Sequence, residues 1–408
     1  MASYRKKLST IYEDKLEELG LSANVLAYRR ILKGDGRGKS NIDFAHDAFS
    51  AIRCAGSCLV LAFDLSDFFG SLRHDRIERL WKWLLKVDRL PIDHFKVLQH
   101  VTRYSYVDLD RAYLALGIKG DVTQRDGNQR TGYLKHRKDV KPQLCFPDEF
   151  RAEIAKKGLI CTWKDRGKPD AGIPQGLPMS DLLANLYMVS FDALARRYAN
   201  KLGGSYLRYS DDILFILPEG TDHLRAMRWV NRAIEILAPG LRFNRDKTEV
   251  GRYQQGASGQ TYHKTLGGED GGLNYLGFRY DGHRVYLRNR TISGFRRTFA
   301  RYAKVAAWKS ARRYANKTAG EILAVVPLHR IMEKVGKVEN FHLRGYDKRA
   351  WTFHTYARRA DKAFSTFGSG IMRQMRKNED SCRAKLAEAV QAVVKTRDNP
   401  ESGKTRKV

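Results

Sequence analysis

Three aspartates, Asp64, Asp211 and Asp212, stand where apolar stretches of this sequence end. Asp64 closes a run that begins at Cys58, and the other two lie between two short apolar runs. A carboxylate buried at such a position is costly unless it is paired or binds a metal ion. An Asp-Asp pair alone is more often turn chemistry. Carboxylates that converge from different strands, however, can hold two divalent ions about 4 Å apart for phosphoryl transfer. The three together favour a metal site.

Positioning these aspartates requires a sheet. The run that ends at Asp64 is typical of a buried strand, and the runs around Asp211 and Asp212 predict a hairpin with the acids at its tip. A periodic apolar pattern before the hairpin predicts a helix that Gly203 and Gly204 end. The full prediction is helices at 4–33, near Asp75, at 181–202 and at 223–237; strands at 57–64, 206–209, 213–217 and 241–250; a loop at 251–272; and a hairpin of 273–278 with 284–287. The polar stretch 121–141 is expected to be an excursion from the core.

Charge and composition narrow the partners. The chain has 408 residues with 75 Lys plus Arg against 45 Asp plus Glu, a net charge of +30, which favours nucleic acid as the partner. It contains neither a long uncharged apolar run nor the apolar core of a signal peptide, so we expect a cytoplasmic protein with no membrane contact. The five cysteines lack a second pair at zinc-ligand spacing and are expected to be reduced.

The basic charge gathers toward the C-terminus. Residues 281–408 contain 30 Lys plus Arg and 11 Asp plus Glu, an excess of 19, and residues 282–320 contain no acid. Aromatic positions alternate there with basic ones at helical spacing, which predicts a helix with one aromatic-apolar face and one basic face. Such a helix could pack on a core through one face and contact a nucleic-acid backbone through the other. The basic positions expected to bind nucleic acid are Arg296, Arg297, Arg301, Lys304, Arg312 and Arg313.

Five motifs resemble those of reverse transcriptases and occur in that family's order. Tyr209-Ser210-Asp211-Asp212 resembles the Tyr-x-Asp-Asp motif, and the segment 63–69 resembles the first palm motif, with an aromatic residue five positions after Asp64. The segment 172–180 resembles the Pro-Gln-Gly loop, the segment 241–248 the fourth motif, and 273–278 the primer-grip hairpin. The resemblance covers about residues 55–280. Ser180-Asp181 departs from the family's Ser-Pro and suggests Ser180 as a helix N-cap.

The resemblance implies an α+β fold of the right-hand polymerase type, with fingers, a palm of antiparallel sheet plus helices, and a helical basic thumb. We expect an N-terminal helical or fingers segment at 1–55, a palm at 56–280 with fingers inserted at about 90–165, a thumb at 281–395 and a polar tail at 396–408. The implied activity is RNA-directed DNA polymerisation with two Mg²⁺ ions, Mn²⁺ being the alternative.

Site residues carry over position by position. The resemblance implies Asp64, Asp211, Asp212 and Lys247 as catalytic residues, and Asp64, Leu65, Asp211 and Asp212 as metal ligands, with Asp212 the weaker. Phe69, Gln175 and Gly176 would bind the nucleotide, Phe69 by excluding a 2′-hydroxyl. A core role for Phe69 and a surface role for Lys247 are the alternatives. The cations that would grip the triphosphate stay open among Arg29, Arg30, Lys33, Arg37 and Lys39.

The expected partners are an RNA template, a DNA product and deoxynucleoside triphosphates. A polymerase core with a basic C-terminus resembles bacterial antiphage reverse transcriptases, including the single-protein type that copies a structured companion non-coding RNA. Two alternatives remain. One is a template-independent or protein-primed DNA polymerase with the same palm, and the other is an RNA-binding scaffold whose polymerase core is inactive, against which the intact aspartate trio argues.

Overall fold

The strands that end at the three aspartates lie in one antiparallel sheet. The computed structural model describes residues 1–123, 127–134, 140, 143–268, 270–336 and 352–399. The helices are α1 Ala2–Glu18, α2 Asn41–Ala55, α3 His74–Leu85, α4 Ile92–Thr102, α5 Leu109–Ala115, α6 Pro147–Glu149, α7 Ser180–Lys201, α8 His223–Leu237, α9 Asn289–Arg313, α10 Ala319–Val325, α11 Leu328–Val335, α12 Phe353–Ala363 and α13 Ile371–Asp398. The strands are β1 Cys58–Asp64, β2 Ser105–Val107, β3 Lys119–Thr123, β4 Gln129–Tyr133, β5 Ile160–Thr162, β6 Ser205–Tyr209, β7 Asp212–Pro218, β8 Glu249–Gly256, β9 Gly259–Leu266, β10 Leu273–Tyr275, β11 Phe278–Tyr280 and β12 Val285–Leu287.

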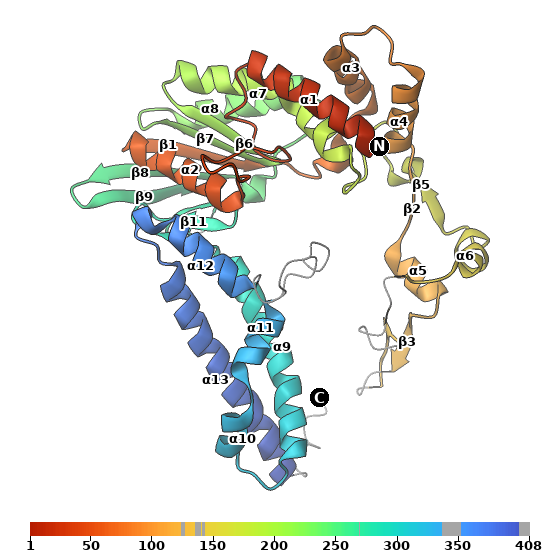
Figure 1. Cartoon of the computed structure of the whole chain (residues 1–408), viewed down its shortest axis with the longest axis vertical. Coiled ribbons are helices and arrows are strands. Elements are labelled where there is room, and N and C mark those ends of the chain that lie inside the picture. Colours follow the sequence, from red (N-terminus) through yellow and green to blue (C-terminus); the bar gives the residue numbers. More distant parts are fainter. Residues whose placement is uncertain (124–126, 135–139, 141–142, 269, 337–351, 400–408) are drawn as a thin grey trace.

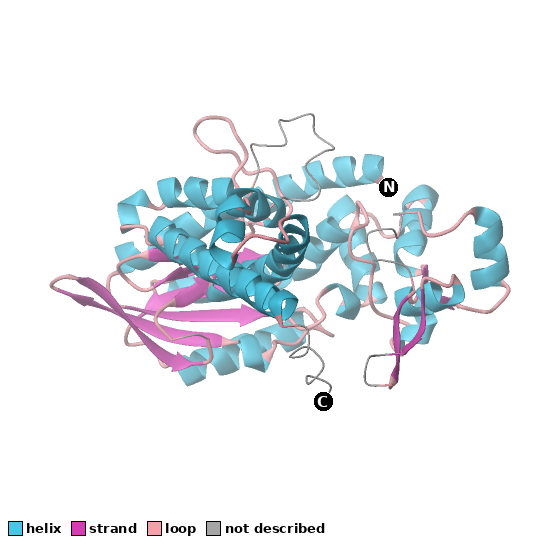
Figure 2. Cartoon of the chain, turned by 90° about the horizontal axis from the view of Figure 1, so that it is seen from below, coloured by secondary structure: helices cyan, strands magenta, loops and turns pink. Residues whose placement is uncertain are grey.

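The main sheet has the strand order β6-β7-β1-β8-β9 and is antiparallel throughout. Its central strands β1 and β7 are almost entirely buried, which explains why both have continuous apolar sequences. Alternate residues of each strand point to opposite faces. Helices therefore cover both faces (Figure 2). Mixed helices and antiparallel strands confirm the predicted α+β class.

The two faces belong to different hydrophobic cores. Leu59, Leu61 and Phe63 of β1 pack in a core built with α1, α3, α4, α7 and α8, whereas Cys58 and Val60 pack toward α2 and α12. The second core also includes the three-stranded sheet β10-β11-β12. Each face of β1 is thus committed to a different set of helices, and a register slip of one residue would exchange them.

Two parts of the chain extend from this sheet. Helices α9 and α13 pack along each other and lead away from the sheet, with α10 and α11 completing a third core between them (Figure 1). Between α4 and α7 the chain forms a separate projection that includes α5, α6 and the pairs β2-β5 and β3-β4 (Figure 1). The described residues of the predicted excursion at 121–141 lie in this projection, whereas 124–126, 135–139 and 141 fall outside the described residues.

The predicted helix at 4–33 is wrong beyond Glu18. The helix ends there, and Gly20 follows in the left-handed conformation at φ 67°. Of the apolar residues that suggested further helix, Leu26 is buried outside any helix and Leu32 is half-exposed. Val25 forms a parallel bridge to Arg208 of β6, so this segment covers an edge of the main sheet. Leu26 is therefore buried by tertiary packing outside a helix, although its spacing from Leu19 is typical of one.

The prediction for residues 241–272 is also wrong. The expected strand at 241–250 is largely an irregular segment with a short 3₁₀ turn, Arg245–Lys247, and the expected loop at 251–272 contains the hairpin β8-β9. Glycines suggested a loop, but Gly251 lies within β8. A glycine is needed there because the Tyr262 ring of β9 occupies the space that a Cβ atom would take. The predicted hairpin after residue 273 forms three short strands.

Other predictions agree closely. The predicted helix at 223–237 matches α8, and the helix at 181–202 differs from α7 by one residue at each end. All five cysteines are free, as expected. Among the described residues, no helix has the length and apolar character needed to cross a membrane.

The short connection between α7 and β6 passes close to β7 at Gly204, and this contact can be tested. A Cβ atom on Gly204 would lie 2.4 Å from the main-chain oxygen of Ile216 in β7, which cannot move without disturbing the sheet. We expect Gly204→Ala to lower the free energy of unfolding by about 1–3 kcal/mol in urea denaturation. The control is Gly220→Ala, at a site with open space for the methyl group. Equal stability of the two variants would contradict the close contact between Gly204 and β7.

Candidate active site

The register of the sheet brings Asp64 and Asp212 together. Asp64 is the last residue of β1 and Asp212 the first of β7, and the antiparallel ladder pairs them directly. Directly opposed residues project to the same face of a sheet. Asp211 lies in the two-residue turn before Asp212, and its main-chain oxygen accepts a hydrogen bond from the Leu65 amide at 3.3 Å. The predicted convergence of carboxylates from different strands is therefore present at one end of the sheet.

The carboxylates interact electrostatically. Burial, followed by the charges of Asp211 and Asp64, raises the pKa of Asp212 to about 7, and Arg288 and Lys247 oppose this rise. Like charges held this close disfavour the ionised form. Positive charge near these aspartates would therefore favour their ionised form.

Lys247 supplies part of that charge. Its Nζ lies 3.0 and 2.9 Å from the two carboxylate oxygens of Asp64. The lysine is placed by the 3₁₀ turn Arg245–Lys247, which is anchored to β1 because the Asn244 amide donates to the Asp64 main-chain oxygen at 2.8 Å. The structure thus brings the predicted Lys247 into the site.

The donor set suits a hard divalent cation. Carboxylate oxygens are the ligands that Mg²⁺ and Mn²⁺ prefer. Burial and the charges of Asp211 and Asp64 raise the pKa of Asp212, and a bound divalent ion would offset both effects. Within the described ranges, no three acidic, histidine or cysteine side chains are arranged as a ready metal-binding group. Leu65 could contribute only through its main-chain oxygen, since its hydrocarbon side chain has no atom that binds a metal ion.

A buried ion pair supports the turn that holds Asp211. Arg208 and Asp192 are both completely buried, and the guanidinium makes two hydrogen bonds of 2.7 Å to the carboxylate. Arg208 also donates to the main-chain oxygen of Ser210 at 3.0 Å. Burial alone would lower the pKa of Arg208, but the charge and hydrogen bonds of Asp192 hold it above its usual value. A permanent cation therefore fixes Ser210, which has a left-handed φ of 59°.

Sequence reasoning missed this pair, although a signal was present. Asp192 falls among the apolar positions of α7, and Arg208 occupies an inward-facing position of β6, two residues after the buried Tyr206. Charged residues on core-facing positions of two neighbouring elements indicate a buried pair. Tyr206 completes the group by donating its hydroxyl to Asp192 at 2.6 Å.

The residues predicted to bind a nucleotide lie on connected segments. Phe69 begins a 3₁₀ turn, Phe69–Ser71, and is partly exposed where it packs against the core. Its main-chain oxygen accepts from the Ile173 amide at 2.9 Å, which joins this turn to the loop with Gln175 and Gly176. Both loop residues are exposed, and Gly176 has a φ of 97° that favours glycine.

The N-cap expected at Ser180 is wrong. Met179 is the cap of α7, and Ser180 is the first residue of the helix. Its hydroxyl instead donates to the main-chain oxygen of Pro174 at 2.6 Å, which closes the loop. Asp181, where the family often has proline, forms an ion pair of 2.6 Å with Arg5 of α1. The departure from the family pattern therefore gives α1 a contact at the start of α7.

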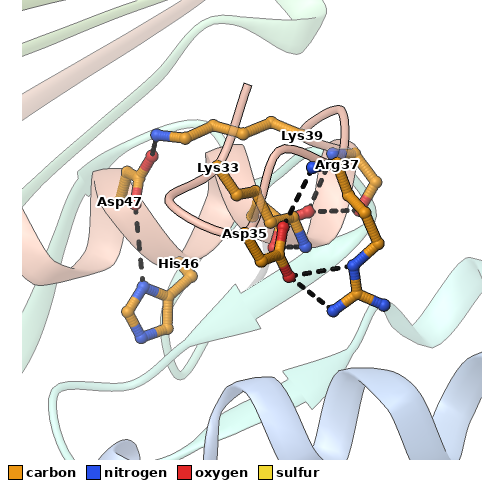
Figure 3. Close-up of polar contacts among 8 residues, drawn as sticks. Lys33, Asp35, Arg37, Lys39, His46 and Asp47 are labelled. Carbon is orange, nitrogen blue, oxygen red and sulfur yellow. Dashed lines mark hydrogen bonds and ion pairs between the residues drawn. The ribbon is translucent and has the colours of Figure 1, made fainter. Parts of the chain in front are cut away.

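Most of the five cations considered as triphosphate ligands are already paired with carboxylates. Arg29 is nearly buried against Glu13, and Lys33 meets Asp43 at 2.6 Å. Figure 3 shows Arg37 against Asp35, and Lys39 with His46 around Asp47. Arg30 is exposed. An anion at this loop would compete with these carboxylates for Lys33, Arg37 and Lys39.

Most of the predicted nucleic-acid residues line the outside of α9. Arg296 is half-buried, and its Nε donates to the Asn378 side chain of α13 at 2.8 Å, so it holds the two helices together. Trp308 departs from the expected packed aromatic face, since it is half-exposed with the Arg312 guanidinium 4.7 Å from its ring centre. The predicted residues that are exposed on α9 are Arg297, Arg301, Lys304, Arg312 and Arg313.

Comparison with known proteins finds a family match for part of the chain. Residues 142–280 match the family described as reverse transcriptase (RNA-dependent DNA polymerase). No curated protein matches the chain. Among solved structures, apo telomerase from Candida tropicalis matches with a TM-score of 0.40 and 13% identity over 99% of this chain and 60% of that one. Telomerase from Candida albicans with a TWJ fragment of telomeric RNA matches with a TM-score of 0.36 and 12% identity over 99% of this chain and 56% of that one. The chain thus spans less than two thirds of either telomerase.

The buried ion pair can be tested through stability. Asp192→Asn leaves the Arg208 guanidinium without its counter-charge in a fully buried position. We expect the free energy of unfolding to fall by about 3–5 kcal/mol in urea denaturation. Glu78→Gln, which removes the partly exposed pair with Lys82 on α3, should cost no more than about 1 kcal/mol. Similar losses for both variants would contradict the supporting role of the buried pair.

Proposed function

We propose that this chain, whose residues 142–280 match the reverse transcriptase family, is an RNA-directed DNA polymerase of the right-hand type that uses two metal ions. The observation that carries the proposal is the pairing of Asp64 with Asp212 at the sheet end, next to Asp211. The reaction joins the primer 3′-hydroxyl oxygen to the α-phosphorus of a deoxynucleoside triphosphate and releases pyrophosphate.

The chain's own residues divide the work. Asp64, Asp211 and, more weakly, Asp212 would hold Mg²⁺ or Mn²⁺, with the main-chain oxygen of Leu65 as a further ligand. The bound ions would activate the attacking hydroxyl and stabilise the charge of the departing pyrophosphate. The Lys247 ammonium, 2.9 Å from Asp64, can donate a proton to that leaving group. Phe69 would contact the sugar, and Gln175 and Gly176 would approach the nucleotide and template.

A double substitution tests the chemistry directly. Replacing both Asp211 and Asp212 by alanine should abolish deoxynucleotide incorporation on a primed RNA template, because these carboxylates would hold metal ions. Thermal melting and RNA binding should stay close to wild type. Asp88→Ala, at an exposed loop position, is the matched control and should retain activity.

Unchanged incorporation by the double variant would overturn the mechanism. Incorporation by wild-type protein without any template would favour a template-independent enzyme. Wild-type protein that binds RNA but incorporates no nucleotide with either Mg²⁺ or Mn²⁺ would favour the inactive scaffold.

We also propose that helices α9–α13 hold the nucleic acid through its backbone. The support is an excess of 19 positive charges in residues 281–408 and the exposed basic positions along α9. A structured non-coding RNA as template, and a role in antiphage defence, are narrower proposals that rest on the combination of a polymerase core with a basic C-terminus. Sequencing the nucleic acid that copurifies with the protein would identify the template.

Salt dependence tests the backbone contact. Neutralising Arg297, Arg301 and Arg312 together should flatten the slope of log affinity for RNA against log salt by about two to three units, because each lost phosphate contact releases about one fewer counterion. The control neutralises Arg225, Arg228 and Arg232, which are exposed along α8 on the other face of the main sheet. Slopes that are parallel for wild type and the α9 variant would place the RNA elsewhere.

A further inference from the structure

Tyr28 has an unusual conformation for a large side chain. Its φ is 63°, in the left-handed region that non-glycine residues seldom adopt, and 41% of the residue is exposed. A strained backbone conformation persists only where its surroundings enforce it, and such residues concentrate at functional sites. An exposed aromatic ring gains little from burial here. The conformation of Tyr28 therefore calls for a cause outside the hydrophobic core.

Contacts on both sides hold the main chain at Tyr28. The Asn185 side chain of α7 donates to the Ala27 main-chain oxygen at 2.9 Å, and Arg5 of α1 donates to the Tyr28 main-chain oxygen at 3.2 Å. On the following residue, the Arg29 guanidinium is bound by Glu13. Three contacts, two from α1 and one from α7, thus fix the direction in which the Tyr28 side chain leaves the backbone.

The side chain is directed at the candidate active site. Its hydroxyl lies 2.9 Å from the Ser210 hydroxyl, in the turn that carries Asp211. Its ring lies edge-on to Phe69, with 6.4 Å between ring centres. Ser210 is itself left-handed, and Arg208 holds its main-chain oxygen. Two strained residues from distant segments therefore meet through a pair of hydroxyl groups, next to the residue expected to contact the sugar.

We propose that Tyr28 forms, with Phe69 and Ser210, one wall of the nucleotide site, and that it positions Phe69 against the sugar of the incoming nucleotide. This inference rests on the proposed polymerase function. The hydroxyl pair fixes the distance between the N-terminal segment and the turn with Asp211, and the edge of the Tyr28 ring limits how far Phe69 can withdraw. Tyr28 is thus a positioning residue that should govern nucleotide affinity and sugar selection, with no part in the chemical step.

Three variants test the hydroxyl pair by steady-state incorporation of dNTP on a primed RNA template. Tyr28→Phe removes one hydroxyl and keeps the ring, and Ser210→Ala removes the other. Each should raise the KM for dNTP by about 2- to 10-fold, the value of one hydrogen bond, with kcat nearly unchanged. The double variant should be no worse than either single one, because both changes remove the same interaction. Tyr4→Phe is the control, because its hydroxyl contacts Asp93 at the surface.

Sugar selection tests the wall itself. Tyr28→Ala should lower the preference for dNTP over rNTP, measured as the ratio of kcat/KM values, in the same direction as Phe69→Ala. Thermal melting of each variant identifies any loss of folding, and Tyr28→Phe, with its unchanged ring, should keep the wild-type preference.

The two proposals fail in different ways. Wild-type KM and sugar preference in both Tyr28 variants, in a protein that does copy RNA, would overturn the inference and leave the polymerase function standing. Additive effects of Tyr28→Phe and Ser210→Ala would show that the hydroxyls act independently and would also overturn it. A wild-type protein that incorporates no nucleotide under any condition would overturn the polymerase function and this inference together.

Discussion

Asp64 and Asp212 repel each other and yet lie opposite each other at the end of one sheet, next to Asp211. The antiparallel register of β1 and β7 enforces this arrangement, because it pairs Asp64 directly with Asp212. The repulsion shows in the pKa of Asp212, which burial and the two neighbouring aspartates raise to about 7. Folding energy from elsewhere has to hold the group in place. Both faces of β1 are covered by separate hydrophobic cores, so the strand that carries Asp64 is anchored from both sides.

The turn between β6 and β7 needs support of its own, since a two-residue connection with Ser210 at φ 59° is strained. The chain meets this need with a buried arginine, whose guanidinium is satisfied by Asp192 on one side and reaches Ser210 on the other. A buried ion pair is weak evidence for added stability. Here its clearer role is to hold the turn in position, because Arg208 donates a hydrogen bond to the main-chain oxygen of Ser210, the residue before Asp211.

The sequence was sufficient wherever one element determined its own structure. The apolar run before Asp64, the periodic patterns of α7 and α8, and the hairpin around Asp211 each carry a local signal, and the structure has all four. Prediction failed where a distant contact decided. Leu26 looks helical by spacing, but its amide donates to the Arg208 main-chain oxygen of β6. Gly251 looks like a loop residue but makes room for the Tyr262 ring. Tyr28 had no sequence signal, because its importance arises only when α1, α7 and the turn at Ser210 meet around it.

These failures share a location. The segment from Leu21 to Tyr28 was predicted to be helix, and it instead runs along the edge of β6 and delivers Tyr28 to the turn. The segment from Leu241 to Thr248 was predicted to be strand, and it instead crosses the end of β1, where Phe243 bridges Leu65 and Lys247 reaches Asp64. Regular structure would have carried both segments past the aspartates. Because they are irregular, main-chain contacts with β1 and β6 can direct Lys247 to Asp64 and Tyr28 to Ser210, the residue before Asp211.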